Sequence, residues 1–567
     1  MTGTLYLGHA KLRDRMLSEK INYLPLFLWL CVIYLAGLFV PLMDNDSAHH
    51  ANIALHMYRT GDYVNLIDQE NDYLDKPHLL FWLTALSYHL FGVTTFAYKF
   101  PSLLFSLLGL YATFRLGERL YSREAGKLAT AILATAFAFI LANNDVRMDA
   151  ILTACIVFAI WQFVHFTDTQ HWRAMLGGCA ALALAFATKG MIGMAVPAFA
   201  ILIHLSWRRR WSMLFNWRWL LVPIVTLVFI SPVLYCYYLQ FDLHPEKVVR
   251  MNTGISGVKF ILWSQNFERL QGSNFGSSAG DDPFFFLHTF LWAFLPWSIL
   301  ALIVLWKRTQ RAFIKSKQHI APKEMLTTGT ILIMLVILSL AGFKLPHYLN
   351  ILFPLFAIAT AGYLTRPHGG RHIKSLFIVQ VVVAILMILF ALIVNVWLFP
   401  IQNFFVIAGV LLVAITFYFQ IRHCTRMNTV LIVSLYAAAL ANFLFNTNYY
   451  PQLLNYQAGN NLARVIREQN ISPDSLYYLE GYERSNSFDF YTARLTPTRK
   501  MEELIDTHEP IFLYTGENGL TVLKERNIRY RKIATHSSYR VSEPKGKFFN
   551  RETRKLVLAQ HYVVEVR

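Results

Sequence analysis

Long apolar segments recur along this chain and restrict its fold more than any other feature. A helix needs about 17–25 apolar residues to cross a hydrocarbon core of roughly 30 Å. Segments that approach this length are 24–43, 98–116, 125–142, 150–166, 174–187, 191–206, 219–239, 284–306, 325–343, 350–364, 376–399, 403–420 and 429–445. Of the 567 residues, 55% are hydrophobic, which is more than a soluble chain can bury. We predict a polytopic α-helical membrane protein with about 13 transmembrane helices.

The formal net charge is +18, and the positions of lysine and arginine predict how the chain sits in the membrane. Short cytoplasmic loops retain basic residues. One set of alternate loops holds most of them, for example Arg208, Arg209 and Arg210, whereas the opposite loops hold few. With an odd number of spans, this pattern places the N-terminus in the cytoplasm and the C-terminal segment outside. Topology and contact with anionic lipids explain the basic excess, so no nucleic acid is expected as a partner.

Hydropathy falls after residue 446, and the rest of the chain has the pattern of a small soluble domain. Strand-like and helical runs alternate there at 460–469, 475–479, 500–507, 510–514 and 561–566. This alternation predicts an α/β domain. We therefore expect a transmembrane domain over 1–446, with a first external loop at 44–97, and an extracytoplasmic α/β domain over 447–567. The basic segment 529–547 is either a solvated face or a surface that touches an anionic partner.

The first external loop carries ionisable residues where the chain leaves the membrane. Asp44 and Asp46 lie just beyond the first apolar segment, and Asp75 and Lys76 lie further along the loop. The spacing of apolar residues between these pairs predicts a helix along the interface, and Asp75-Lys76-Pro77 is expected to open a second helix. Asp46 could alternatively serve only as a helix N-cap.

Charged and polar residues also end the other hairpins on this side. They include Arg147, Asp149, Lys189, Arg269, His347 and Tyr348. Ionisable groups at the membrane edge cost several kcal/mol unless they pair or face water, so each is a functional candidate. Structural roles are the alternative: Lys189 could reach the headgroups, and Arg147 could pair with Asp149 alone. Because several hairpins bring charge to one face, we predict a single external cavity suited to a lipid-linked phosphate.

No metal or other cofactor is expected. His49, His50, His288 and His347 have spacings that match no standard ligand set, and the five cysteines form no CxxC pair. The sequence also lacks the GxGxxG and GxxxxGKS/T motifs, which counts against nucleotide hydrolysis as the driving chemistry.

The first external loop also resembles that of a known family. The run from Asp46 through Gly61-Asp62 to Asp75-Lys76-Pro77 is similar to the ArnT-like branch of the protein O-mannosyltransferase superfamily, which has the GT-C fold. The segments VRMDA, ATKG, NFER and LPHYLNILFP extend this similarity over essentially the whole chain. The resemblance implies transfer of one sugar from a polyprenyl-phosphate donor, outside a bacterial inner membrane. The best-known member transfers 4-amino-4-deoxy-L-arabinose to lipid A.

The resemblance also implies roles for particular residues. Asp46 matches the catalytic aspartate of the first loop, and Asp149 matches the acid of the second. Serine follows Asp46 where many relatives have glutamate, so Asp44 stays open as the base. The predicted substrate-binding residues are Lys76, Arg269, Lys189, His347, Tyr348, Arg147 and Asp75. Of these, Lys76 and Arg269 match positions that hold the donor phosphate.

The reaction implied is a single displacement with inversion. Lys76 and Arg269 would stabilise charge on the departing lipid phosphate, while Asp46 would take a proton from an incoming hydroxyl or position a phosphate acceptor. The acceptor stays open between lipid A, another lipid, a glycan and a protein. We expect a monomer that binds membrane lipids and a lipid-linked sugar donor. Two alternatives remain: a glycan ligase or polymerase, and a sugar-lipid transporter or flippase, which should have helices broken near mid-membrane.

Overall fold

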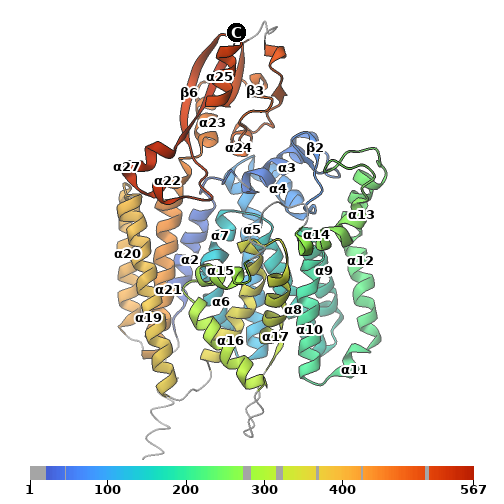
Figure 1. Ribbon diagram of the computed structural model, residues 1–567. Helices are drawn as coiled ribbons and strands as arrows, with labels where there is room; N and C mark the ends of the chain where they lie inside the picture. Colours follow the sequence, from blue (N-terminus) through green and yellow to red (C-terminus); the bar gives the residue numbers. More distant parts are fainter. Residues whose placement is uncertain are drawn as a thin grey trace, which may run out of the picture.

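The computed structural model describes residues 21–44, 46–272, 282–313, 324–365, 370–422, 426–504 and 510–566. Figure 1 shows a tall helical bundle with a smaller unit of strands and helices above it. The first half of the bundle contains α2 (Leu24–Gly37), α5 (Thr95–Leu120), α6 (Arg123–Thr135), α7 (Phe137–Asn144), α8 (Asp149–Thr169), α9 (Trp172–Lys189), α10 (Ile192–Trp207), α11 (Trp211–Leu214), α12 (Trp217–Tyr237) and η1 (Tyr238–Asp242). The second half contains α15 (Phe285–Ala293), α16 (Ser298–Phe313), α17 (Leu326–Leu340), η4 (Pro346–Leu352), α18 (Phe353–Leu364), α19 (Gly370–Leu392), η5 (Ile393–Leu398), α20 (Phe404–Ile421), α21 (Arg426–Leu444), η6 (Phe445–Tyr449) and α22 (Tyr450–Leu454).

Among the described residues, seven helical stretches are long and apolar enough to cross a membrane, and a bent pair would make an eighth. The seven are Thr95–Leu120, Asp149–Thr169, Trp217–Asp242, Pro346–Leu364, Ile378–Leu398, Phe404–Ile421 and Asn428–Leu454. Shorter apolar helices include α2, α10 and α17. The chain is therefore a polytopic helical membrane protein, as predicted, while the number of thirteen spans stays a prediction. The expected domain boundary at 446 falls inside the last of these stretches.

Two of the predicted continuous spans are broken. The segment 125–142 divides at Ala136 into α6 and α7, whose axes differ by 55°. The segment 284–306 divides between α15 and α16. The two breaks lie together, because Phe137 N donates to Leu295 O at 3.1 Å and Trp297 Nε1 donates to Thr135 Oγ1 at 2.9 Å. One backbone N–H at the first break is therefore satisfied by a carbonyl at the second, as a low-dielectric interior requires.

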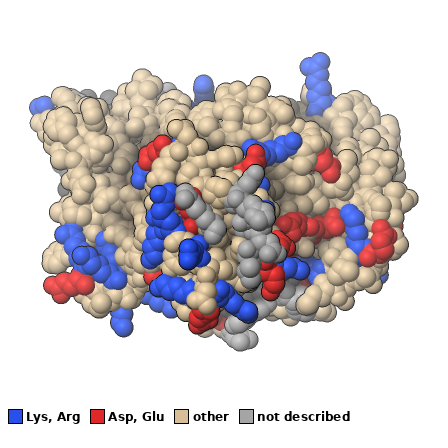
Figure 2. Space-filling model, turned by 90° about the horizontal axis from the view of Figure 1, so that it is seen from above, with Lys and Arg blue, Asp and Glu red and all other residues tan. Residues whose placement is uncertain are grey.

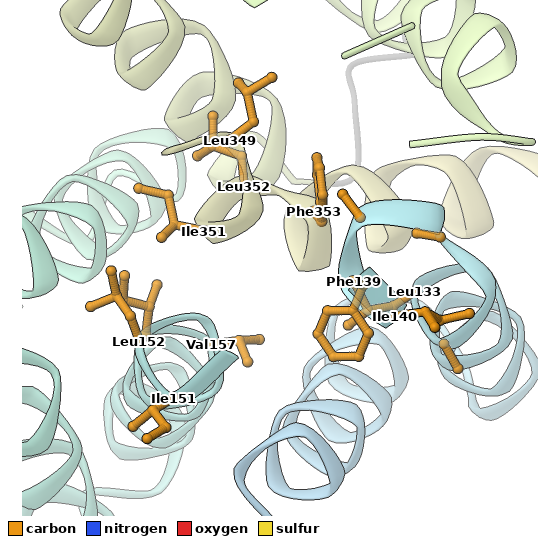
Figure 3. Packing of buried hydrophobic residues seen from close by; sticks show 14 of the residues in the cluster. Leu133, Phe139, Ile140, Ile151, Leu152, Val157, Leu349, Ile351, Leu352 and Phe353 are labelled. Atoms are coloured by element: carbon orange, nitrogen blue, oxygen red, sulfur yellow. The ribbon is translucent and has the colours of Figure 1, made fainter. Parts of the chain in front are cut away.

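The core of the bundle surrounds α8 and the η4–α18 helix. In the apolar stretch of α8, 83% is buried inside the protein, and in that of η4–α18, 89% is buried. The value for α20, at the edge of the bundle, is 11%. Figure 3 shows Ile351 of η4 and Leu152 of α8 directed toward each other between their helices. Close packing at this point holds the first residues of α8 and η4 in fixed positions.

The first external loop forms two helices, α3 (Asp46–Thr60) and α4 (Leu79–Phe91), with the short hairpin β1 (Ile67–Asp68) and β2 (Asn71–Asp72) between them. The helix predicted along the interface is α3. The second helix begins at Leu79 after His78, so the expectation that Pro77 lies in its first turn was wrong. Residues before a proline avoid helical conformation, and the Asp75-Lys76 segment forms a bend instead.

The segment between η1 and α15 contains α13 (Gly257–Lys259), η2 (Phe260–Ser264) and α14 (Gln265–Gln271). Helix α14 ends at Gly272, whose φ of +72° suits glycine. A Cβ atom there would also come within 3.1 Å of the Gly342 backbone. This close approach places Arg269 of α14 beside the segment that follows α17, and Phe343 N donates to Arg269 O at 3.3 Å.

The C-terminal segment contains a five-stranded sheet of order β4-β3-β5-β7-β6. Its strands are β3 (Leu476–Leu479), β4 (Thr498–Arg499), β5 (Ile511–Gly516), β6 (Tyr530–Ser538) and β7 (Ala559–Val566). Strands β4 and β5 run parallel to β3, whereas β7 runs antiparallel to both β5 and β6. The helices are α23 (Ala458–Glu468), α24 (Asn486–Thr492), α25 (Glu517–Glu525), α26 (Gly546–Phe549) and α27 (Arg551–Arg554), and the short turns are η7 (Pro473–Ser475), η8 (Glu502–Leu504) and η9 (Lys555–Val557).

Side chains of the sheet alternate between two apolar layers. Tyr514 and Val563 pack with α23 on one face, whereas Leu513 and Val564 pack with α25 on the other. This period of two is that of strands buried on both faces. The predicted helix at 460–469 and the three predicted strands match α23, β3, β5 and β7, whereas the pattern missed β6. The part of the predicted helix at 500–507 that lies beyond Leu504 is outside the described residues.

Candidate active site

Helix ends at the upper end of the bundle converge on one charged region. Asp46 is the first residue of α3, Asp149 is the first residue of α8, and Lys189 is the last residue of α9. An acid at a helix N-terminus and a base at a C-terminus both interact favourably with the helix dipole. Figure 2 shows the molecule from this end, where charged side chains of both signs spread over the central and lower parts of the view and fewer lie along its upper border.

Asp46 and Asp145 hold Arg147 between them. Asp46 Oδ2 lies 2.8 Å from Arg147 Nη1, and Asp145 Oδ2 accepts from both Nη2 and Nε at 2.9 and 3.1 Å. The Asp46 side chain is 41% exposed, whereas Asp145 is 10% exposed. Arg147 therefore does not pair with Asp149, which was one structural alternative. Asp145, to which the sequence assigned no role, orients the arginine, and Asp46 keeps an open side.

Asp149 and Lys189 form a second, deeper ion pair. Lys189 Nζ donates to Asp149 Oδ1 at 2.9 Å, and the two side chains are 7% and 4% exposed. The same ammonium lies 4.6 Å from the centre of the Tyr348 ring, in cation–π contact. Lys189 thus points inward to a carboxylate, so the prediction that it could merely reach the headgroups was wrong.

His347 connects these two pairs. Its Nδ1 accepts from Arg147 Nη1 at 3.4 Å, and its Nε2 lies 3.9 Å from Asp149 Oδ2. Because Nδ1 is an acceptor, the ring proton belongs on Nε2, where it faces the carboxylate. The site is therefore one network that extends from Asp46 to Lys189.

Lys76 and Arg269 complete the cationic side of the region. Arg269 Nη1 donates to Tyr348 Oη at 3.4 Å. Lys76 has electrostatic contact with Arg269, Lys189, Asp46 and Asp149, yet no hydrogen bond or ion pair is recorded for its ammonium among the described residues. Burial, followed by repulsion from Arg269 and Lys189, holds the pKa of Lys76 well below its usual value. An anion placed beside Lys76 would relieve this repulsion.

Asp75 is held at the edge of this region. Its carboxylate forms an ion pair with Arg250, which also pairs with Glu268 at 2.9 Å, and its carbonyl accepts from Gln265 Nε2 at 2.5 Å. These contacts tie the Lys76 segment to η2 and α14. Sequence reasoning gave no role to Arg250, because only the fold brings it to the first loop.

Asp44 faces away from the network. Its two oxygens accept from Ser487 N at 2.6 Å and from Ser485 Oγ at 2.7 Å, at the start of α24. Burial raises the pKa of the Asp44 carboxyl, and these hydrogen bonds partly oppose the rise. Of the two acids left open as the base, Asp46 is the one that meets Arg147. The catalytic and binding roles of all these residues stay predictions.

The histidines considered as metal ligands have other contacts. His49 Nε2 lies 2.8 Å from Asp68 Oδ2 and its ring stacks on His50, while His288 Nε2 lies 2.7 Å from Asp282 Oδ2. Cys31, Cys155, Cys179 and Cys236 are free thiols, and Cys424 lies outside the described residues. No cluster of three or more histidine, cysteine or acidic side chains suited to a metal occurs within the described part of the chain.

Comparison with known sequences gives partial matches to glycosyltransferases. Residues 75–236 match the family described as dolichyl-phosphate-mannose-protein mannosyltransferase. The undecaprenyl phosphate-alpha-4-amino-4-deoxy-L-arabinose arabinosyl transferase 1 of Pseudomonas fluorescens is 26% identical over 331 residues, which are 55% of this chain and 51% of that protein. A transferase from Edwardsiella ictaluri has the same name except for the final number. It is 26% identical over 355 residues, which are 60% of this chain and 59% of that protein. The chain thus spans between about half and three-fifths of these relatives.

Comparison of folds covers more of the chain. The crystal structure of ArnT from Cupriavidus metallidurans bound to undecaprenyl phosphate matches 96% of this chain and 97% of its own, with a TM-score of 0.73 and 18% identity. The fold is therefore that of ArnT, which has the GT-C fold. The sequence matches and the similar fold together confirm the resemblance to ArnT-like proteins inferred from the first loop.

Proposed function

We propose that this chain transfers a single sugar from a polyprenyl-phosphate donor to an acceptor at the external face of a bacterial cytoplasmic membrane. The observation that carries this proposal is the shared position of the Asp46–Arg147 and Asp149–Lys189 pairs beside Lys76 and Arg269. The partial relatives named above act on an undecaprenyl phosphate-linked aminoarabinose, and the ArnT structure holds undecaprenyl phosphate. From these proteins we carry over to this chain only the class of donor, which is a polyprenyl-phosphate-linked sugar.

The cations of the site would act on the leaving group. When the sugar departs, negative charge concentrates on the lipid phosphate, and prearranged positive groups stabilise it. Lys76 suits this role because it lies buried beside other cations and no carboxylate pairs with it among the described residues. Arg269, fixed by its contact with Tyr348, would hold the same phosphate. No metal or nucleotide is needed for this step.

Asp46 would act on the acceptor. Its Oδ2 is bonded to Arg147, yet 41% of the side chain is exposed toward the site. An aspartate held in this way can orient an incoming hydroxyl and accept its proton, or position an acceptor phosphate. The Arg147 ion pair fixes the carboxylate in place, and Asp145 fixes Arg147 from the other side.

A lipid-linked sugar transporter or flippase is the second candidate, since transporters contain broken helices. The breaks between α6 and α7 and between α15 and α16 are the observation that favours it. These breaks contact each other through the Phe137–Leu295 and Trp297–Thr135 hydrogen bonds. The charged side chains lie instead at the helix ends, which supports chemistry there.

Asp46→Asn tests the proposal. Loss of a general base or orienting acid typically costs about 10²–10⁴-fold in rate, so transfer should fall by that factor. Membranes would be incubated with a radiolabelled polyprenyl-phosphate sugar, and the products separated to show whether one sugar, a block or nothing moves. Asp72→Asn, in the same loop but bonded to Gln240 and Lys247, is the matched control. Full turnover by a folded Asp46→Asn protein contradicts the assignment.

A further inference from the structure

A cleft of about 300 Å³ lies between the bundle and the C-terminal sheet, apart from the network just described. Met43 and Asp44 form its lower wall, and Asn486 at the start of α24 and the segment after β6 form the rest. Two arginines, Arg484 and Arg540, line this cleft, and so do the serines Ser538 and Ser542. Arg540 and Ser538 belong to the basic segment 529–547, for which the sequence left an anionic contact open.

Polar groups in the walls of the cleft already have hydrogen-bond partners within the protein. Gln457 Oε1 accepts from Asp44 N and Gln457 Nε2 donates to Leu42 O, both at 2.8 Å. The Asp44 carboxylate takes its two hydrogen bonds from Ser485 and Ser487. Both oxygens of this acid are therefore engaged with the protein, which reduces its repulsion of an anion in the cleft.

The two guanidinium groups remain available. Arg484 is exposed and lies 4.9 Å from the centre of the Tyr478 ring, which orients it without neutralising its charge. Arg540 meets Glu543 at 3.0 Å, but with 73% and 60% of the two side chains exposed, such a surface pair is worth little. Guanidinium groups bind phosphate oxygens through paired N–H donors, and serine hydroxyls add further donors.

We propose that this cleft binds a phosphate group of the sugar acceptor. Asp44, in its wall, lies two residues before Asp46, so the cleft lies at the start of α3, the helix that contains the proposed base. The contacts of Asp44 with α24 also connect the cleft to the start of α3. The assignment to the acceptor rests on the proposed transferase function, whereas phosphate binding by itself does not.

The binding test uses the full chain in phosphatidylcholine nanodiscs, titrated by calorimetry with glucose 1-phosphate, inorganic phosphate or glucose. All the proteins compared carry Lys76→Ala, so that the cationic site around Lys76 contributes less to the measured phosphate binding. Arg484→Ala with Arg540→Ala should weaken glucose 1-phosphate binding at least tenfold. Arg526→Ala with Arg529→Ala, which removes the same charge from exposed positions of the same domain, should leave it unchanged.

The outcomes separate the sources of the phosphate. Tighter binding of glucose 1-phosphate than of inorganic phosphate supports a sugar-phosphate acceptor, and equal binding supports recognition of phosphate alone. Equal affinity in the cleft variant and its control overturns the proposal, as does equal binding of glucose. With Lys76 restored, the cleft variant should raise the KM for a phosphorylated acceptor tenfold and leave the donor KM unchanged. If the unsubstituted chain transferred no sugar from a polyprenyl-phosphate donor while phosphate binding still required Arg484 and Arg540, only the transferase function would fail.

Discussion

Asp149 and Lys189 form an ion pair with almost no contact with solvent, at 4% and 7% exposure. Removing one partner of such a pair leaves a buried charge uncompensated, which typically costs about 3–5 kcal/mol. Replacing both partners by neutral groups leaves no such charge. The energetic role of the pair can therefore be measured separately from its role in catalysis.

We expect Asp149→Asn and Lys189→Met each to lower the unfolding temperature of the purified protein in detergent markedly. The double variant should unfold closer to the wild type than either single variant does. Thermal unfolding followed by tryptophan fluorescence measures this coupling. Glu118→Gln is the control, because its pair with Arg115 at 3.3 Å is exposed and worth little. Additive losses in the double variant would show that the two residues act independently.

At this scale the sequence predicted which residues gather in one region better than it predicted their partners. Asp46, Lys76, Asp149 and Arg269 do gather in one region, and Asp46 and Asp149 lie at helix ends that apolar periodicity can locate. Arg147 is two residues from both Asp145 and Asp149, and nothing in a linear pattern says which one it meets. The turn between α7 and α8 decides this.

At the scale of elements, the helix breaks were the main departure from prediction. Hydropathy measures the length of an apolar run, and a break at an alanine such as Ala136 leaves that measure unchanged. Pro296 was a visible signal for the second break. The bonds that stabilise both breaks join residues more than 150 positions apart, such as Thr135 and Trp297, and no local pattern contains them.

Thr135→Val should destabilise the bundle. The Trp297 side chain is fully buried, and its Nε1 has Thr135 Oγ1 as its acceptor. Leaving a buried donor without an acceptor costs about 1–3 kcal/mol. The unfolding temperature in detergent should fall accordingly. Thr130→Val, on the same helix but bonded to Gly126 O of its own turn, should have a smaller effect. Equal effects would mean that the contact between the breaks adds nothing.

Helix α24 contains a carboxyl whose ionisation opposes folding. Burial raises the pKa of Asp489 to about 7, although bonds from Thr496 and Tyr478 partly offset the rise. The folded state therefore binds this proton more tightly than the unfolded state does. The contribution of Asp489 to stability is fully present below its ordinary pKa of 3.8 and is lost as pH rises through about 7.

Asp489→Asn should remove this pH dependence. The amide oxygen can still accept from Tyr478 Oη and Thr496 N, but it carries no charge. Hydrogen exchange of β3 and α24 in the full-length protein should show more protection for the variant than for the wild type at pH 8, and little difference at pH 5. Asp474→Asn, at a side chain 90% exposed, serves as the control. Unchanged exchange at pH 8 would show that the buried carboxyl is tolerated without cost.

At the scale of the whole molecule, the two ends of the bundle carry different charge patterns. Figure 1 places α11 at the lower end and the C-terminal sheet at the upper end. Beside α11, Asp168 accepts from Arg119, Arg208 and Arg210 at 2.9, 3.2 and 3.4 Å. One carboxylate among several arginines leaves a net positive surface, as expected of the cytoplasmic side. The upper end combines acids and bases in the proposed site.

This asymmetry predicts the orientation, on which an external reaction depends. In a variant without native cysteines, Thr521→Cys on α25 should react with a membrane-impermeant maleimide in intact spheroplasts. Ser212→Cys on α11 should react only after the membrane is permeabilised, and both positions are exposed in the fold. A lipid-linked donor presents its phosphate to one side of the bilayer, so the site must open to that side. Labelling in the reverse pattern would place the Asp46 network in the cytoplasm, where the proposed donor would have to be bound on the opposite leaflet.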